Sequence, residues 1–248
     1  MISFINVGSG SKGNATLIYD EKTIIQIDMG LTKKRVTEAL STIGKNICDL
    51  QGILVTHEHT DHIKNLYMYK GKVPIHASRG TVDFFDEEVI PEESFEIGTF
   101  TIIPFETSHD ASNPVGYVIF SGDTKLVYIT DTGYIPEASL DYLKNADYYI
   151  VESNHDLKML MDSHRPACLK RRIKGDVGHL SNIDSAIYMS ECISEKTKAI
   201  YLAHLSEECN LPEIALESYR KTFKRKNVAL NVPVICLKQH EMVKGGDE

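Results

Sequence analysis

The amino-acid sequence predicts an α/β fold, a four-layer αββα sandwich with mixed sheets. Short, β-branched apolar runs that are typical of strands occur in two groups along the chain, and each group is followed by segments with helical periodicity. The composition does not shift toward a linker anywhere. We therefore expect a single domain over residues 1–248, ordered to about residue 240, with a short polar tail from Lys244 to Glu248.

Composition narrows the class of protein. The 248 residues are 42% hydrophobic and 25% charged, as in an ordinary globular chain that buries a sizeable core. The net charge of −8 argues against a broad basic face for nucleic acid, but a small site with bound metal ions remains compatible with it. We find no apolar run long enough for a membrane span and no signal-peptide pattern. Five widely spaced cysteines indicate reduced thiols, so we expect a cytoplasmic protein.

The first expected strands flank a glycine-rich loop. Ile2 to Val7, Ala15 to Tyr19 and Thr23 to Asp28 have strand patterns, and Gly8 to Gly13 between them has the spacing G-x-G-x-x-G. Because a strand follows the loop where a dinucleotide-binding motif requires a helix, that motif is excluded, and the Lys-Ser/Thr of a Walker A loop is missing. Two interpretations remain: backbone N–H groups that surround an anion with help from Lys12, or glycines needed only for turn geometry.

The same patterns predict the remaining elements in order. They are a helix over Thr32–Ile43 that ends at Gly44, a strand over Gly52–Val55, a helix over Ile63–Tyr69, a strand over Pro74–Ala77, hairpins over Phe95–Phe105 and Val115–Ile129, a strand over Tyr148–Val151, helices over Asp156–Met161 and Ser181–Ile193, a strand over Ala199–Leu202, a helix over Pro212–Phe223 and a strand over Val234–Leu237.

The segment from Thr56 to His62 carries the strongest chemical signal. Three imidazoles and a carboxylate fall within six residues, directly after an expected strand. His57 and His59 leave extended chain on the same side, whereas Asp61 and His62 lie on the turn into the next helix. Two ligand groups that diverge from one loop suit a pair of metal ions. A merely polar loop would require three of the ten histidines to gather here by chance, so we predict a metal site.

This H-x-H-x-D-H motif resembles the signature of the metallo-β-lactamase superfamily, whose fold is the αββα sandwich. Three further residues, each after an apolar run, match the rest of that pattern: His109, Asp131 and His204. Three other segments are similar to the YycJ/VicX (WalJ) branch, which is regarded as nuclease-like: Ser9–Asn14, Glu152–Asp156 and Gly178–Asn182. No long insertion separates Asp131 from His204, so the extra domain of the β-CASP nucleases is missing.

The resemblance implies two divalent metal ions per chain. Three histidines would bind the first ion: His57, His59 and His109. Three other residues would bind the second: Asp61, His62 and His204. Asp131 would bridge the two ions, and Asp28 would support the loop without binding metal. Zn²⁺ suits this ligand set best, and the ligand types also admit Mn²⁺ and Fe²⁺.

The resemblance also implies phosphodiester hydrolysis by metal-activated hydroxide, with DNA as the expected substrate and an exonuclease as the expected activity. His179 would act as general acid, Glu152 would orient it, and Asp61 would take part in catalysis. Seven residues are expected to contact substrate: Ser11, Lys12, Asn14, Arg171, Arg172, Ser206 and Asn210. The role of His155 stays open.

Two alternatives are compatible with the same residues. One is a small-molecule hydrolase of this fold that acts on a thioester, a lactone or a cyclic phosphodiester, which the negative charge favours. The other is a metal-stabilised DNA-binding or regulatory protein without turnover. The sequence does not decide the oligomeric state, the choice of DNA over RNA, or the polarity of cleavage.

Overall fold

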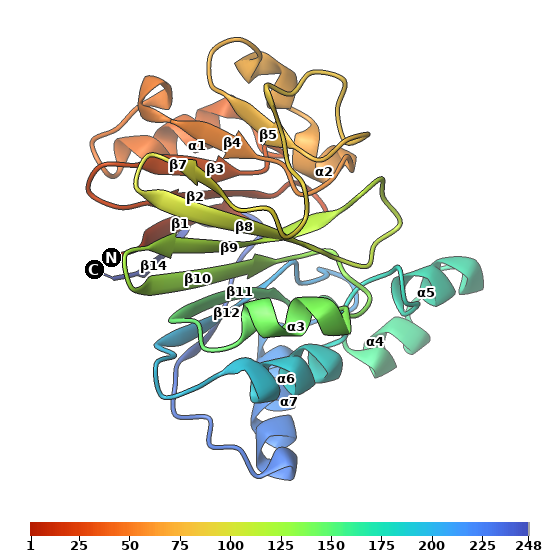
Figure 1. Ribbon diagram of the computed structural model, residues 1–248. Coiled ribbons are helices and arrows are strands. Elements are labelled where there is room, and N and C mark those ends of the chain that lie inside the picture. Colours follow the sequence, from red (N-terminus) through yellow and green to blue (C-terminus); the bar gives the residue numbers. More distant parts are fainter. Residues whose placement is uncertain (248) are drawn as a thin grey trace. The chain divides into compact units, whose positions relative to one another are not determined.

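The computed structural model of the protein describes residues 1–247, and these form two compact units. Unit 1 contains Met1–Glu106, Ala111–Lys125 and the residues from Lys238 onward. Unit 2 contains Thr107–Asp110 and Leu126–Leu237. Figure 1 labels the elements of both units. That residues 1–248 form a single domain stays a prediction.

Unit 1 contains a seven-stranded mixed sheet in the order β14-β1-β2-β3-β4-β5-β6. Its strands are β1 (Ser3–Gly8), β2 (Ala15–Tyr19), β3 (Ile24–Ile27), β4 (Gly52–Leu54), β5 (Ile75–Ala77), β6 (Glu87–Glu88) and β14 (Val243–Gly246). Neighbouring strands from β14 to β3 are antiparallel, and those from β3 to β6 are parallel. The segment His57–His62, here called the metal loop, therefore follows β4. This strand lies between two parallel neighbours, and each of its residues is buried.

Helix α1 (Lys33–Ser41) packs on this sheet. Thr32 caps its N-terminus by accepting a hydrogen bond from the backbone N–H of Arg35. Its buried residues Val36 and Leu40 belong to the same hydrophobic cluster as Ile53 of β4. Unit 1 also contains a short 3₁₀ helix, η1 (Ile47–Asp49), and the antiparallel strands β7 (Phe95–Ile97), β8 (Phe100–Glu106) and β9 (Val115–Ser121).

The helix predicted over Ile63–Tyr69 is wrong. The structure has α2 (Thr60–Ile63) and then a separate 3₁₀ helix, η2 (Leu66–Tyr69). Asn65 breaks the helix because its backbone N–H donates to the carbonyl of Met29 and its side-chain amide donates to that of Leu31. Hydrogen bonds with a loop that is distant in the sequence therefore override the local helical propensity.

Unit 2 contains parallel strands in the order β10-β11-β12-β13, with bounds β10 (Thr124–Ile129, in this unit from Leu126), β11 (Tyr148–Glu152), β12 (Ala199–Ala203) and β13 (Val234–Cys236). Its helices are α3 (Glu137–Leu143), α4 (Leu157–Asp162), α5 (Ala167–Ile173), α6 (Asn182–Cys192) and α7 (Pro212–Lys226). Because the strands are parallel, their carboxyl ends lie at one edge of the sheet. A polar residue that directly follows one of these parallel strands therefore lies at that edge.

Two helices of unit 2 were not predicted, α3 and α5. Each has seven residues, too few to establish a helical period in the sequence, and each follows a proline at its N-cap. Arg171 and Arg172, which were predicted to contact substrate, therefore lie on a helix.

The polar tail predicted from Lys244 to Glu248 contains a strand instead. Val243–Gly246 forms β14, which pairs with β1 through Ser3↔Gly246 and Asn6↔Val243. β1 would otherwise be an edge strand with unpaired backbone groups. The last residue of the predicted tail, Glu248, lies outside the described residues. No helix within residues 1–247 is both long and apolar enough to cross a membrane.

Candidate active site

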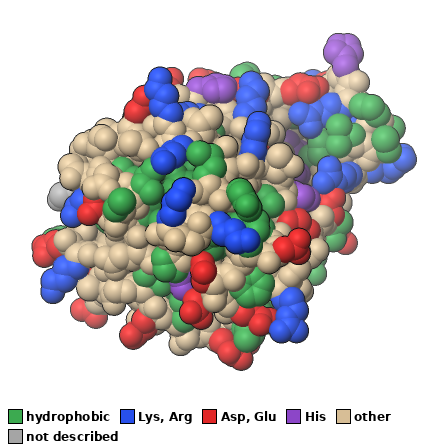
Figure 2. Space-filling view, turned by 90° about the horizontal axis from the view of Figure 1, so that it is seen from above, with side chains coloured by type: hydrophobic (Ala, Val, Ile, Leu, Met, Phe, Trp, Pro, Cys, Tyr) green, Lys and Arg blue, Asp and Glu red, His purple; other side chains and the backbone are tan. Residues whose placement is uncertain are grey.

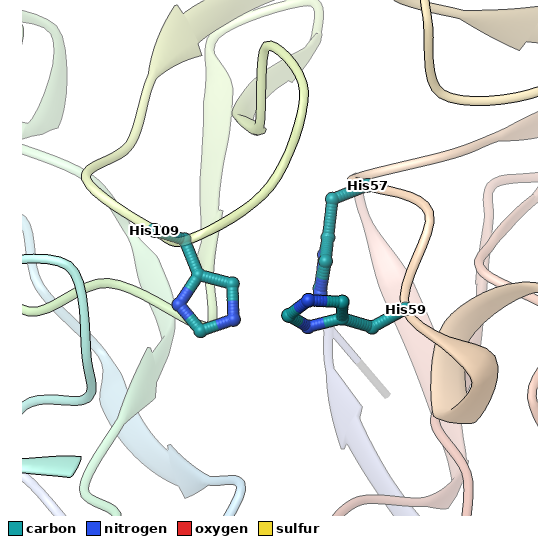
Figure 3. A group of neighbouring side chains, drawn as sticks. All are labelled: His57, His59 and His109. Carbon is teal, nitrogen blue, oxygen red and sulfur yellow. The ribbon is translucent and has the colours of Figure 1, made fainter. Parts of the chain in front are cut away.

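In unit 1, the His57–His62 segment presents its imidazoles from a short loop and the start of α2. Figure 3 shows that the rings of His57 and His59 leave the same loop next to each other, with centroids 4.6 Å apart. The ring of His62 lies 4.1 Å from that of His57. His57 and His62 are buried, and Asp61 is 24% exposed. The rings of His57 and His59 therefore lie close together, as expected for side chains that leave an extended chain on the same side.

A buried aspartate holds this loop. The Asp28 carboxylate lies 2.7 Å from Nδ1 of His62 and accepts hydrogen bonds from the backbone N–H and the hydroxyl of Thr56. Asp28 itself has a positive φ of 58°, a backbone conformation that a non-glycine residue adopts only when its surroundings enforce it. Because Asp28 accepts the proton of Nδ1, Nε2 of His62 is the nitrogen left for a metal ion.

The glycine-rich loop packs against the same segment. The backbone N–H of Gly10 donates to Oδ1 of Asn14, that of Lys12 donates to Oε1 of Gln239, and that of Asn14 donates to the carbonyl of Asp61. Since these groups are used within unit 1, the structure favours turn geometry over an anion-binding nest. Ser11 and Lys12 are exposed, and their contact with substrate stays a prediction.

Asn14 and Gly30 fit closely against Asp61 and His62. Nδ2 of the buried Asn14 lies 3.4 Å from Oδ2 of Asp61 and 3.0 Å from Nε2 of His62. A Cβ atom on Gly30 would lie 1.6 Å from the carbonyl oxygen of Asp61, so only glycine fits there. This supporting role of Asn14 was not predicted, because sequence spacing does not show which loops meet.

In unit 2, three predicted site residues follow three parallel strands. Asp131 comes after β10, Glu152 ends β11 and His204 comes after β12, so all three lie at one edge of the sheet. Asp131 and His204 have positive φ values of 57° and 54°. Such backbone strain at non-glycine residues is typical of functional sites. His179 comes from the loop that precedes α6.

Glu152 is the centre of this cluster. It is fully buried, and one carboxylate oxygen lies 2.8 Å from Nδ1 of His179 and 2.9 Å from Nδ1 of His204. The other oxygen accepts hydrogen bonds from the backbone N–H groups of Thr132 and Leu180. Burial alone would raise its pKa, but the charge and hydrogen bond of His179 and the hydrogen bond of His204 outweigh burial and lower the pKa to about 2. Glu152 is therefore a carboxylate that fixes two imidazoles, and its bond to His204 was not predicted.

Asp131 lies among three imidazoles. Its Oδ1 atom is 3.2 Å from Nδ1 of His204, 3.5 Å from Nδ1 of His179 and 3.9 Å from Nε2 of His109. Nδ1 of His109, a residue also drawn in Figure 3, donates to the carbonyl of Gly178 at 2.9 Å. Burial is the main cause that lowers the pKa of His109, which favours the neutral ring that metals bind.

The imidazoles therefore fit divalent metal binding. In three of them a protein oxygen faces Nδ1, and the residues with their partners are His62 with Asp28, His109 with Gly178, and His204 with Glu152. This is the arrangement in which Nε2 is the ligand atom and the ring orientation is fixed. Within unit 2, ligand atoms of Asp131, Glu152, His179 and His204 lie within 4.8 Å of one another.

Two of the basic residues predicted to contact substrate, Arg171 and Arg172, lie on α5. Arg172 forms an ion pair with Asp110, next to His109, and this pair raises the pKa of Arg172. Lys170 donates to the carbonyls of Met161 and Ser163 at 2.6 Å, so it holds the preceding turn. Arg171 is exposed. Contact of Arg171 and Arg172 with substrate stays a prediction.

Ser206 and Asn210 are both buried. The amide of Asn210 donates to the carbonyls of Ser153 and Asn154, and the backbone N–H of Ser206 donates to that of Asn154. These bonds hold the loop that follows Glu152. Contact of Ser206 and Asn210 with substrate stays a prediction.

His155 lies in the same loop and is 1% exposed. Burial is the main cause that lowers its pKa to about 4, so the ring is neutral near pH 7. The structure does not give it a role in the site.

This geometry agrees with comparisons to known proteins. Residues 27–204 match the model of the beta-lactamase superfamily domain, and the chain belongs to that superfamily. It is 37% identical over 238 residues to exodeoxyribonuclease YycJ of Bacillus anthracis, covering 91% of this chain and 90% of that protein. It is 36% identical over 224 residues to exodeoxyribonuclease WalJ of Streptococcus pneumoniae serotype 2 (strain D39), covering 84% and 83% of the two chains.

A solved structure shows the same fold. The metallo-β-lactamase fold protein YhfI from Bacillus subtilis superposes with a TM-score of 0.72 at 16% identity, over 98% of this chain and 99% of that one. The predicted αββα sandwich of the metallo-β-lactamase type and the predicted family are therefore confirmed.

Proposed function

We propose that this protein is a metal-dependent phosphodiesterase that removes nucleotides from DNA ends. The observation that carries the proposal is the buried Glu152 carboxylate, which holds both His179 and His204. A hydrolase of thioesters or lactones does not require a second oriented imidazole of this kind. The exodeoxyribonuclease names of the two relatives support the choice of DNA.

We assign two divalent metal ions to the residues of the superfamily pattern, with Zn²⁺ as the first choice and Mn²⁺ or Fe²⁺ as the others. His57, His59 and His109 would hold the first ion, Asp61, His62 and His204 would hold the second, and Asp131 would serve both. When bound, such ions supply a Lewis acid and a water-derived nucleophile at neutral pH.

His179 supplies the proton in this proposal. Its Nδ1 faces Glu152, so the ring orientation is fixed and Nε2 is directed away from the carboxylate. Its side chain is 18% exposed, which leaves access for a substrate. Nε2 then donates a proton to the oxygen of the leaving nucleotide, the step that phosphodiester cleavage needs and that general acids accelerate by about 10²- to 10⁴-fold.

Arg171 would bind phosphates of the strand beyond the cleaved bond. We further propose a cytoplasmic location, because the five cysteines are odd in number and widely spaced along the sequence.

The test is a digestion of end-labelled single- and double-stranded DNA and RNA by purified protein with Zn²⁺, Mn²⁺ or Fe²⁺. We expect mononucleotide release from DNA, and a loss of at least about 10²-fold in His179→Ala and Asp61→Ala. Lys221→Ala, on the exposed face of α7, is the matched control and should keep full activity. No cleavage of any nucleic acid or of bis-p-nitrophenyl phosphate with any metal would refute the proposal. Binding of DNA ends without cleavage would establish the non-catalytic alternative.

A further inference from the structure

Unit 1 exposes an aromatic side chain close in sequence to the metal loop. Tyr67, in η2, is 69% exposed. Its ring meets that of Phe84 edge to face, with centroids 5.5 Å apart and an interplanar angle of 89°. Phe84 is half-buried and packs against the hydrophobic core of unit 1, so it anchors one edge of the Tyr67 ring. The pair is therefore a supported aromatic surface and not a loose side chain.

One lysine lies beside both rings of this aromatic pair. Nζ of Lys70 lies 5.7 Å from the ring centroid of Tyr67 and 5.3 Å from that of Phe84. Residues 62–82 also contain Lys64, Lys72 and an arginine but no Asp or Glu, although the chain as a whole carries a net charge of −8. Figure 2, the face seen from above in Figure 1, shows exposed hydrophobic side chains with Lys and Arg between them. An exposed apolar side chain alone means little, but an exposed aromatic ring with a lysine ammonium beside it fits a ligand with both rings and negative charge.

The position of Tyr67 relative to His62 is limited by the chain. The two residues are five positions apart, and Asn65 between them is fixed by its hydrogen bonds to Met29 and Leu31. Five Cα–Cα steps of 3.8 Å span at most about 19 Å. A stacked strand advances about 3.4 Å per nucleotide, so a base on Tyr67 would lie within about six nucleotides of a phosphate at the metal loop.

We propose that Tyr67, Phe84 and Lys70 bind an unpaired base near the end of a DNA strand. The base stacks on the exposed ring of Tyr67, and Lys70 binds an adjacent phosphate. Base–aromatic stacking tolerates any sequence, which suits an enzyme that must move along a strand. The inference rests on the proposed function, because an enzyme that removes nucleotides from DNA ends is what would bind an unpaired strand here.

The chain contains no tryptophan, so Tyr67→Trp introduces a single fluorescent reporter. In a metal-loaded His179→Ala background, titration with oligothymidylate should quench this fluorescence, with the same affinity as that measured by anisotropy of labelled DNA. A tryptophan at the exposed Met242, in Met242→Trp, is the control and should not be quenched.

Measurements of DNA affinity on two further variants test the same site. Tyr67→Ala should weaken binding of single-stranded DNA by about 5- to 150-fold, the effect of losing one stacked base, whereas Tyr67→Phe keeps the ring and most of the affinity. Binding of blunt duplex DNA should change little in either variant. Equal affinity of Tyr67→Ala and the parent for single-stranded DNA, or unchanged fluorescence of Tyr67→Trp, would overturn the inference.

The two proposals fail separately. If the protein with His179 intact cleaves DNA but the Tyr67→Trp reporter is not quenched, the stacking site is wrong and the proposed function stands. If the reporter is quenched but no cleavage occurs with any metal, the stacking site stands and the exonuclease is wrong.

Discussion

Replacement of Glu152 by glutamine should destabilise the metal-free protein in a pH-dependent way. The folded pKa of Glu152 is about 2, against an ordinary value of 4.5, because the two imidazoles stabilise the buried carboxylate. Glutamine lacks this charge and cannot accept from both imidazoles, and a hydrogen bond to a charged group contributes about 1.5–3 kcal/mol, so we expect the substitution to cost roughly 3 kcal/mol at neutral pH. Between these two pKa values the unfolded chain binds more protons than the folded one. The stabilisation of the folded protein by the Glu152 carboxylate is therefore fully present above pH 4.5 and is lost as the pH falls toward 2.

The assay is thermal unfolding of chelated wild-type protein and Glu152→Gln, followed by circular dichroism at pH 6, 5, 4 and 3. For a chain of this size about 3 kcal/mol corresponds to a difference in Tm of roughly 6–12 °C at pH 6, and this difference should shrink steadily below pH 4.5. Glu217→Gln removes an exposed carboxylate of α7 and should leave Tm unchanged throughout. A Tm difference between wild type and Glu152→Gln that is the same at pH 6 and pH 3 would refute the reasoning.

Three further predictions concern the rest of the site. Gly30→Ala should reduce both the Tm and metal content, because the added Cβ would lie 1.6 Å from the carbonyl oxygen of Asp61 and force the metal loop to move. Asp28→Asn should weaken metal binding by about 10- to 100-fold in competition with a chelating dye, because it removes the charge that orients His62. Arg171→Ala should lower the slope of log K against log salt concentration by about one for DNA binding, because the variant neutralises one phosphate fewer.

Each of these has a control or a contrary outcome. Gly71→Ala, at a positive φ of 68° but with no atom within 4 Å of the new Cβ, should cost about 1 kcal/mol and leave metal content unchanged. Equal metal affinity of Asp28→Asn and wild type would show that the aspartate is not needed to orient its imidazole. An unchanged salt slope in Arg171→Ala would mean that this arginine does not bind a phosphate of the substrate.

Local patterns in the sequence were sufficient to predict most of the strands and the protein family. β4 and the loop after it could be predicted because a short apolar run ends directly at a dense group of imidazoles. The long helices α6 and α7 could be predicted because each has a clear start, Ser181 as N-cap of α6 and Pro212 at the first turn of α7.

Contacts between distant segments could not be predicted. Nothing local indicates that Glu152 bonds His204 as well as His179, since the three residues lie on different elements. The break at Asn65 depends on carbonyls more than thirty residues earlier in the chain. β14 forms because β1 offers it an unpaired edge, which the composition of the last residues does not reveal.

The central claim is that bound divalent metal enables this chain to hydrolyse DNA ends. Its most direct test measures nucleotide release from end-labelled DNA while metal-free protein is titrated with Zn²⁺ or Mn²⁺, with bound metal per chain determined on the same samples. We predict no release without metal, a rise with occupancy and a plateau at two ions per chain. Full activity in the metal-free protein, or no nucleotide release at two bound ions per chain, would contradict the account.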